Sequence, residues 1–427
     1  MYLSTTRASD IAGDTPAPKG PLRAVPGTVF VLGLVSLVTD VSAEMVTAVL
    51  PLYLMAGLGM SPLAFGALDG LHQGATAVLR LAGGRIADRT RRHKLVAGTG
   101  YALSAACKAA LLLAATPWSV AAVLAADRTG KGLRTAPRDA LISLSVLPGE
   151  QGRAFGVHRA LDTAGALLGP LAAFGILWVA VDGYEAVFTV SCCVAVLGVV
   201  LLALFVREAA PPPAPPLASV SAPTRARPPL PPVRILLRLP GLRRLCLTAA
   251  LLGLFTVGDA FLYLLLQRRL DLSAAFFPLL PVGTAAVFLL AALPVGRLAD
   301  RVGRSRVFLG GHVLLLGACL LLLGPVPAAG GALLVVGVLA MLGLFYAATD
   351  GVLMAAAGPL LPAGLRTTGL AVLQTAQALA RFAGSLMFGS AWTLWGPGAA
   401  LGLAAAGLLL SLAVVAVFGG ARAERAS

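Results

Sequence analysis

Acidic side chains stand inside apolar runs long enough to cross a membrane, where charge is costly. Asp40 and Glu44 are four residues apart, so a helix places both on one face. Two neighbouring carboxylates repel each other, and one of them then readily accepts a proton. A charged residue at the centre of a membrane helix costs roughly 2.5–3.5 kcal/mol, so such residues usually mark function. The pattern favours proton binding by Asp40 or Glu44, adjusted by Arg128; the alternative is a buried ion pair that only fixes helix packing.

Further polar residues in the apolar runs favour a polar cavity between helices. Asp69, His72, Gln73, Thr76 and Arg80 share one helical face, and a similar face carries Asp259 and Tyr263 four residues apart. More of this charge lies in the first half of the chain, so we expect ion coupling there and a cavity lined by both halves. The candidate residues for proton coupling and the cavity are Asp40, Glu44, Asp69, His72, Arg128, Asp162, Asp259, Gln374, Gln377 and Arg381.

The elements that must position these residues are membrane helices. The chain of 427 residues is 58% hydrophobic and only 12% charged, with a mean hydropathy of +0.89. A soluble surface needs about twice that fraction of charge, whereas apolar runs of roughly 20 residues span a bilayer. Twelve such runs are predicted near 27–56, 62–82, 95–115, 118–145, 153–178, 184–206, 243–267, 274–296, 307–325, 331–357, 366–393 and 398–419. The expected fold is therefore all-α and integral to the membrane.

The runs divide into two sets of six around a proline-rich, basic segment. We predict a disordered cytoplasmic tail at 1–26, helical bundles at 27–206 and 243–419, a cytoplasmic linker at 207–242 and a tail at 420–427. Arginine and lysine concentrate in alternate loops, so both termini are expected in the cytoplasm of a multi-pass plasma (inner) membrane protein. The net charge of +15 follows this loop pattern.

An internal repeat relates the two sets. Residues 84–89 read Gly-Arg-Ile-Ala-Asp-Arg and residues 296–301 read Gly-Arg-Leu-Ala-Asp-Arg, while Arg153 and Arg366 precede a glycine at nearly the same offset. Two motifs that recur after nearly the same number of residues indicate that a six-helix unit is used twice. The pseudo-symmetry would bring Asp88 near Arg366 and Asp300 near Arg153.

These repeated loops resemble the signature of the major facilitator superfamily, which lies between the second and third helices of each half. The residues that match in the gating loops are Gly84, Asp88, Arg89, Gly296, Asp300, Arg301, Arg153 and Arg366; Ile86 and Arg91 depart from the pattern. Arg128 and Gly132 resemble the family's fourth-helix motif. Gly156, Gly165, Gly169 and Pro170 resemble the fifth-helix motif of its antiporters, although Ala173 and Phe174 replace a final glycine pair.

The resemblance implies a twelve-helix antiporter-like carrier in which the two bundles rock about a central site. Cytoplasmic contacts through Asp88 and Asp300 would then break when the carrier opens inward; the alternative is that these charges only set topology. Close packing and a bend at Gly156–Pro170 favour an exporter.

The favoured function is proton-coupled export of a small organic or drug-like molecule by a monomeric carrier whose partners are the bilayer, the solute and protons. A proton-coupled importer is the alternative. A divalent-metal exporter using Asp40, Glu44, Asp69 and His72, and a scaffold without transport, are less favoured. We find no nucleophile–base constellation, phosphate-binding loop or cofactor motif, so an enzyme, a cofactor, a resident metal and nucleic-acid binding are not expected.

Overall fold

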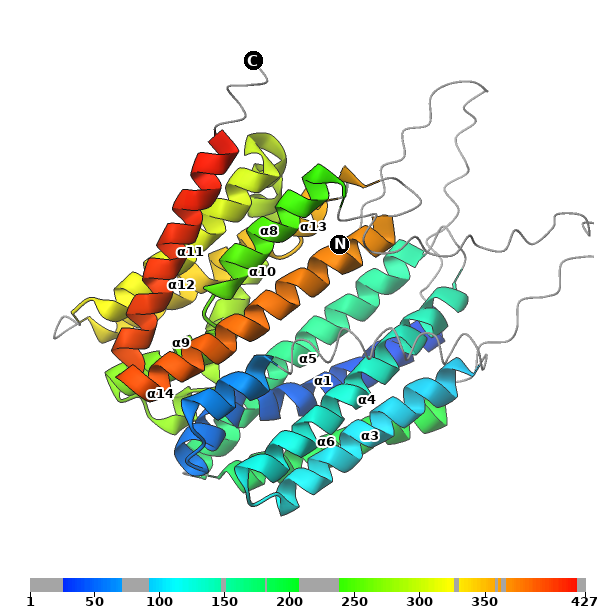
Figure 1. Ribbon diagram of the computed structural model, residues 1–427. Helices are drawn as coiled ribbons and strands as arrows, with labels where there is room; N and C mark the ends of the chain where they lie inside the picture. The colour runs from blue at the N-terminus through cyan, green and yellow to red at the C-terminus, as the bar shows by residue number, and fades with distance from the viewer. Residues whose placement is uncertain are drawn as a thin grey trace, which may run out of the picture.

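The computed structural model describes residues 26–70, 92–146, 151–180, 183–206, 238–325, 330–357, 360–361 and 366–420. The predicted tails, most of the 207–242 linker and residues 71–91 lie outside this part. The described chain is nearly all helical, as the sequence predicts (Figure 1).

The first group of helices lies within residues 27–206. It contains α1 (Gly27–Leu52), which continues as the π-helical turn η1 (Tyr53–Gly57), a helix at 62–70, α3 (His93–Leu113), α4 (Pro117–Leu144), α5 (Gln151–Val179) and α6 (Tyr184–Phe205). In this group α1 packs against α5 and α6, and α3 packs against α4 and α6.

The second group begins at residue 240. It contains α8 (Pro240–Leu254), α9 (Asp259–Leu270), the 3₁₀ turn η4 (Ala274–Phe276), α10 (Leu279–Val302), α11 (Arg304–Leu323), α12 (Gly331–Thr349), α13 (Val352–Ala357) and α14 (Arg366–Gly420). Here α10 and α11 pack against α12, and α8 and α11 pack against α14. The boundaries predicted for α4 and for the start of α1 lie within one residue of the observed ones.

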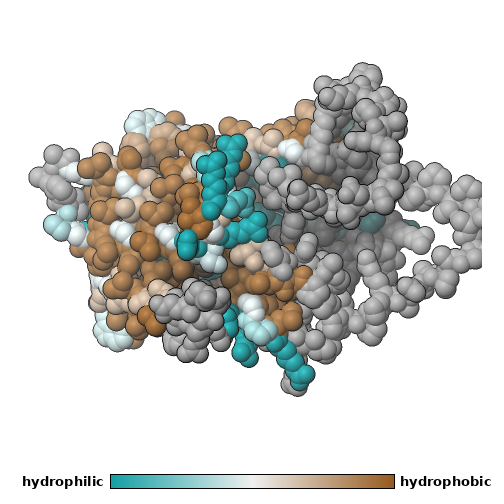
Figure 2. Space-filling model, turned by 90° about the horizontal axis from the view of Figure 1, so that it is seen from above, coloured by the Kyte–Doolittle hydropathy of each residue, from teal (hydrophilic) through white to brown (hydrophobic). Residues whose placement is uncertain are grey.

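Eight helical segments of the described chain are long and apolar enough to cross a membrane. They support a multi-pass membrane protein, and Figure 2 shows the apolar outer surface that a bilayer would solvate. Leu113, Val179 and Leu290 are each more than 80% exposed on that surface. The predicted count of twelve is not reproduced by this criterion, in part because α4 carries too much charge and because the run at 62–82 is described only to residue 70.

Two predicted runs are interrupted in the structure. The run at 243–267 breaks at residues 255–258 between α8 and α9, and the run at 331–357 breaks at Asp350–Gly351, where Gly351 has φ +80°. The runs at 366–393 and 398–419 form two arms of α14, separated by Gly396 with φ +84° and ψ 169°. Apolar length alone does not reveal the breaks at 255–258 and at Asp350–Gly351, because the residues around them remain hydrophobic.

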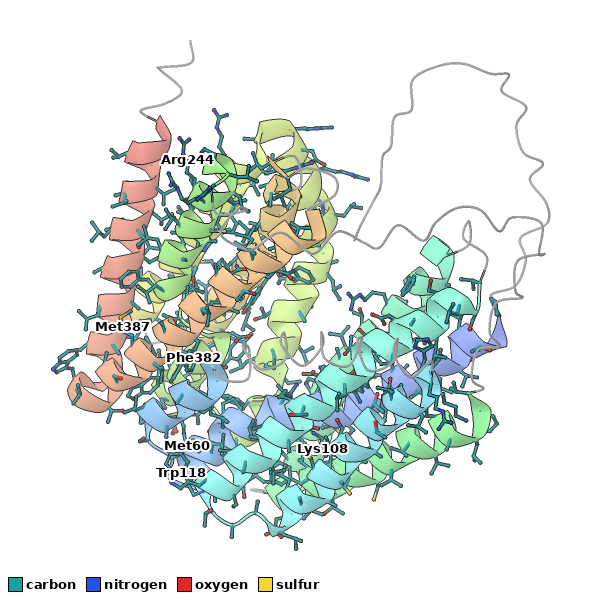
Figure 3. The ribbon with its side chains drawn as sticks, turned by 45° about the vertical axis from the view of Figure 1, so that its right-hand side comes forward. Met60, Lys108, Trp118, Arg244, Phe382 and Met387 are labelled. Carbon is teal, nitrogen blue, oxygen red and sulfur yellow. The ribbon has the colours of Figure 1, made fainter. Side chains whose placement is uncertain are left out.

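The two groups contact each other at one end of the molecule. Phe65 packs edge-to-face on Phe261, and Trp178 packs edge-to-face on Phe276. The backbone N–H of Leu63 donates to Thr393 Oγ1 at 3.2 Å. Figure 3 shows the ribbons meeting at the end that carries Met60 and Trp118 and spreading apart towards the end that carries Arg244.

Candidate functional site

One face of α4 carries a stripe of charge. The helix starts with Thr116 as its N-cap, whose Oγ1 accepts a hydrogen bond from the Ser119 N–H at 3.2 Å, and with Pro117 in its first turn. Four charged residues then recur at intervals of four, three and four, which places them in one row along the helix: Asp127, Lys131, Arg134 and Arg138. The row faces partners on α1, α3 and α5, and the ion pairs are Lys108–Asp127 (3.2 Å), Lys131–Glu44 (3.8 Å), Arg134–Asp40 (3.5 Å) and Arg138–Asp162 (3.6 Å).

At the Asp127 end of the row, Asp127 forms a buried cluster with Lys108 of α3 and with Arg128, which we call the α4 cluster. Asp127 Oδ2 lies 3.2 Å from Lys108 Nζ and 3.7 Å from Arg128 Nη2. The three side chains are between 4% and 7% exposed, so water screens them little. Two cations therefore share one carboxylate inside the first group of helices.

The other end of the row is a hydrogen-bonded network. Arg138 Nη1 donates to Ser36 Oγ at 3.1 Å, and Ser36 Oγ is hydrogen-bonded to His158 Nε2 at 3.0 Å. Arg159 donates to Asp162 from a side chain that is 79% exposed. Asp162, which we predicted near the cavity, is thus part of this ion-pair network.

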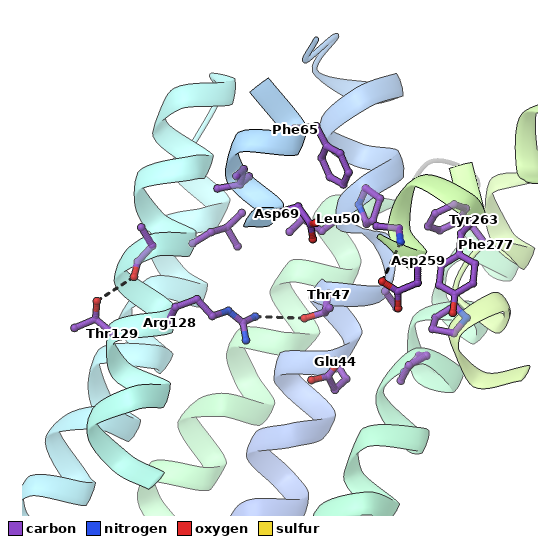
Figure 4. A pocket seen from close by; sticks show the side chains of 18 residues that line it. Glu44, Thr47, Leu50, Phe65, Asp69, Arg128, Thr129, Asp259, Tyr263 and Phe277 are labelled. Carbon is purple, nitrogen blue, oxygen red and sulfur yellow. Dashed lines mark hydrogen bonds between the residues drawn. The ribbon is translucent and has the colours of Figure 1, made fainter. Parts of the chain in front are cut away.

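A cavity of about 420 Å³ lies between the two groups. It has the size of a small-molecule site. α1, the helix at 62–70, α4 and α5 line it from the first group, and α9 and α10 from the second. Most of its described wall is apolar. Among the described residues that line it, the ionisable ones other than tyrosine are Glu44, Asp69, Arg128 and Asp259 (Figure 4).

A second polar cluster lies where the two groups meet, and we call Asp69, Asp259, Tyr346, Arg381 and Ser385 the junction cluster. Ser385 Oγ donates to Asp69 Oδ2 at 3.0 Å, and the Ala260 N–H donates to Asp259 Oδ1 at 3.1 Å at the start of α9. Arg381 interacts electrostatically with both carboxylates, and Tyr346 lies beside Asp259. This cluster joins residues separated by up to 316 positions in the sequence.

The structure changes our interpretation of Asp40, Glu44 and Arg128. The two carboxylates share a helical face as predicted, but each has its own cation, Arg134 for Asp40 and Lys131 for Glu44. Arg128 is paired instead with Asp127 and donates to Thr47 Oγ1 at 3.5 Å. Neither acid is therefore ion-paired with Arg128 in the described residues, because α4 directs it one turn further along α1.

Most of the intramembrane charge lies in the first half, as predicted, but the junction cluster adds Asp259 and Arg381 from the second half. Asp69, Asp259 and Arg381 come together there. Gln374 is exposed and Gln377 half-buried on α14, and neither lines the described cavities. His72 lies outside the described residues.

The fifth-helix residues divide into two kinds. A Cβ added to Gly165 would lie 2.5 Å from the carbonyl oxygen of Leu37, and one added to Gly169 would lie 2.7 Å from that of Val41. These glycines let α5 approach the backbone of α1, and Pro170 lies within the same stretch of helix and lines the cavity. Gly156 has open space around it.

Most of the predicted gating residues cannot be placed. Gly84, Asp88 and Arg89 lie outside the described residues, and the side chains of Arg153 and Arg366 are not described either. Asp300 is 3.1 Å from Arg304 within its own group, and Arg304 donates to the Ala355 carbonyl at 2.7 Å. Gly296 has open space around it, and Arg301 lies in the last turn of α10.

Sequence reasoning missed Lys108, Tyr346 and Ser385. A lysine in the middle of the run at 95–115 was a readable signal, since an unpaired charge there is costly. Tyr346 and Ser385 gave no such signal, because isolated polar residues are common in apolar helices and only the tertiary fold brings them beside the acids.

The comparisons with known proteins agree with this geometry. The Major Facilitator Superfamily profile matches residues 32–385, and the chain belongs to that superfamily. An uncharacterized MFS-type transporter of Methanocaldococcus jannaschii is 38% identical over 148 residues, which are 34% of this chain and 36% of that protein. The multidrug resistance protein MdtH of Cronobacter sakazakii is 36% identical over 114 residues, 27% of this chain and 28% of that protein. Each match thus spans only about a third of the relative's length.

Solved structures share the fold over nearly the whole chain. The nucleoside transporter NupG superposes with a TM-score of 0.71 at 14% identity, covering 92% of this chain and 99% of that one. A bacterial homolog of the human lysosomal transporter Spinster, in an inward-facing and occupied conformation, gives 0.64 at 17% identity, covering 91% and 93%. The profile match confirms the predicted superfamily, and these structures share its fold.

Proposed function

We propose that this chain is a secondary active transporter that moves a small organic solute by alternating access, as a proton-coupled exporter in the plasma membrane. The observation that carries the proposal is the 420 Å³ cavity, which both groups of helices line and which holds ionisable groups on an apolar wall. A scaffold has no use for charge at that depth, since burying it is costly.

The proposed architecture is twelve spans in two pseudo-symmetric bundles, at 27–206 and 243–419, with both termini in the cytoplasm. In that orientation the packed end, where Leu63 meets Thr393 and Trp178 meets Phe276, faces outward. The conformation is then open to the cytoplasm. In this state the proposed cytoplasmic contact between Asp300 and α5 would be broken, and Asp300 is paired with Arg304 of its own group.

Coupling is assigned to the junction cluster. Asp69 and Asp259 come from different groups of helices and have only Arg381 as a shared cation among the described residues. A proton on either carboxylate neutralises the surplus negative charge and so favours contact between the two groups of helices at the junction. Loss of that proton restores the repulsion between Asp69 and Asp259 and favours separation of the two groups. A proton and a cationic group of the solute would compete for the same carboxylates.

Export is favoured over import by the partial similarity to MdtH and by the close α1–α5 packing at Gly165 and Gly169. Import of a small metabolite by the same fold is the second candidate. A divalent-metal exporter is disfavoured, because Asp40 and Glu44 are ion-paired and the described residues contain no group of three potential ligands.

The test is purified protein in proteoliposomes with an imposed pH gradient, screened against solute classes. We expect counter-movement of protons and solute, lost in Asp69→Asn and Asp259→Asn. Asp271→Asn is the matched control, because this exposed residue ends α9 with φ +47°, which asparagine tolerates. A gradient that moves no solute of any class would refute transport, and full coupling in both variants would refute the assignment to the junction.

A further inference from the structure

The first wall of the cavity carries surplus positive charge. In the α4 cluster Lys108 and Arg128 share Asp127, which leaves one positive charge when all three are ionised. Of the three, Arg128 lines the cavity. Its Nε is buried without a hydrogen-bond partner, and its Nη2 reaches Thr47 only at 3.5 Å. Because protein atoms enclose this Nε, the donor capacity left for a ligand lies on Nη2, which makes only long contacts of 3.5 Å with Thr47 and 3.7 Å with Asp127.

The opposite wall carries surplus negative charge. Asp69 and Asp259 both line the cavity, while Arg381, their one nearby cation in the described chain, lies behind them in the junction. The group Asp69, Asp259 and Arg381 therefore holds one negative charge when ionised. Arg381 also has a buried Nε without a hydrogen-bond partner.

The one further charged residue of the described cavity wall, Glu44, has its own cation. Glu44 lies 3.8 Å from Lys131, and both side chains are about a third exposed or less. Between the charged walls the lining includes Leu50, Phe65, Tyr263 and Phe277. Figure 4 shows Arg128 entering from α4 and Asp259 from α9, with Thr47 and Leu50 of α1 between them.

We propose that the transported solute is a zwitterion with an apolar middle, whose anionic group binds Arg128 and whose cationic group binds Asp259 and Asp69. The inference rests on the proposed transport function and names its substrate class. A solute with one charge leaves the charge on one wall of this mostly apolar cavity without a partner, which is unfavourable. A zwitterion compensates both walls and adds no net charge.

A matched set of three ligands tests the proposal by equilibrium binding to the full-length protein in lipid nanodiscs. The probes are 4-(aminomethyl)benzoate, 4-methylbenzylamine and 4-methylbenzoate, which share a ring and differ in which charges they carry. We expect the zwitterion to bind at least about tenfold more tightly than either singly charged probe, since each charged hydrogen bond is worth roughly one tenfold step or more. Equal binding, tighter binding of a singly charged probe, or no binding up to millimolar concentration overturns the proposal.

Two variants test which wall of the cavity binds which charged group of the solute. In Arg128→Gln the zwitterion and 4-methylbenzylamine should bind equally, and in Asp259→Asn the zwitterion and 4-methylbenzoate should do so. Arg159→Gln and Asp271→Asn remove the same charges from exposed positions and should keep the tenfold preference. Because the wild-type comparison needs no variant, misfolding of either variant leaves the test valid.

The same probes separate this inference from the transport proposal. If the gradient assay moves only singly charged solutes, the zwitterion is wrong and transport stands. If it moves nothing while the zwitterion binds as expected, the transport function fails and the binding site stands.

Discussion

Asp127 should matter more for stability than the lysine it pairs with. In Asp127→Asn, Lys108 and Arg128 remain buried and face each other without their shared carboxylate. In Lys108→Met, Asp127 still has Arg128 at 3.7 Å, and the methionine fills the same apolar space. Removing one partner of a buried pair costs about 3–5 kcal/mol when it leaves an uncompensated charge. We therefore expect Asp127→Asn to reach that range and Lys108→Met to lie well below it.

The double variant Asp127→Asn with Lys108→Met completes a thermodynamic cycle. It removes one charge of each sign and leaves a single buried cation, Arg128. We expect its stability to lie between those of the two single variants, with a coupling of at least about 1 kcal/mol between the sites.

The measurement is thermal unfolding of the purified protein in one detergent at fixed lipid content. Arg159→Gln serves as the control, because its side chain is 79% exposed and a surface ion pair contributes about 0–1 kcal/mol. Equal losses in the two single variants, or additive losses in the double variant, would refute the sharing of Asp127 by two cations.

Three further outcomes follow from the structure. Gly169→Val should prevent α5 from approaching α1 and destabilise the protein by at least about 2 kcal/mol, whereas Gly156→Ala should be neutral; equal unfolding temperatures would contradict this. In a background without the native cysteines, Leu63→Cys with Thr393→Cys should form a disulfide on oxidation and stop transport, and reduction should restore it. Undiminished transport in the crosslinked protein would show that the packed end of the molecule need not open. Asp88→Asn should slow transport in proteoliposomes at unchanged membrane insertion, and a normal rate would leave Asp88 with only a topological role.

Part of the site was readable from spacing. Asp40 and Glu44 share a face because a helix repeats every 3.6 residues, and this holds in any tertiary arrangement. Asp69, Asp259 and Arg381 stood out because charge in an apolar run is rare. Their assembly into one junction was not readable, since it depends on how the helix at 62–70 and α14 pack across the two groups.

The assignment of partners was the least predictable step. Every cation in the row on α4 lies within reach of several acids when only spacing is known. The register of α4 against α1 selects Arg134 for Asp40 and Lys131 for Glu44, and it leaves Arg128 to Asp127 and the cavity. A shift of one turn would exchange these partners without any change in sequence.

The sequence by itself determined that this protein is helical, lies in a membrane and belongs to a repeated-bundle superfamily, because apolar length and loop motifs are local properties. The tertiary structure decided which charges meet, where the helices break at residues 255–258 and Asp350–Gly351, and which side chains line the cavity. These depend on packing between helices far apart in the chain, which local residue patterns do not encode.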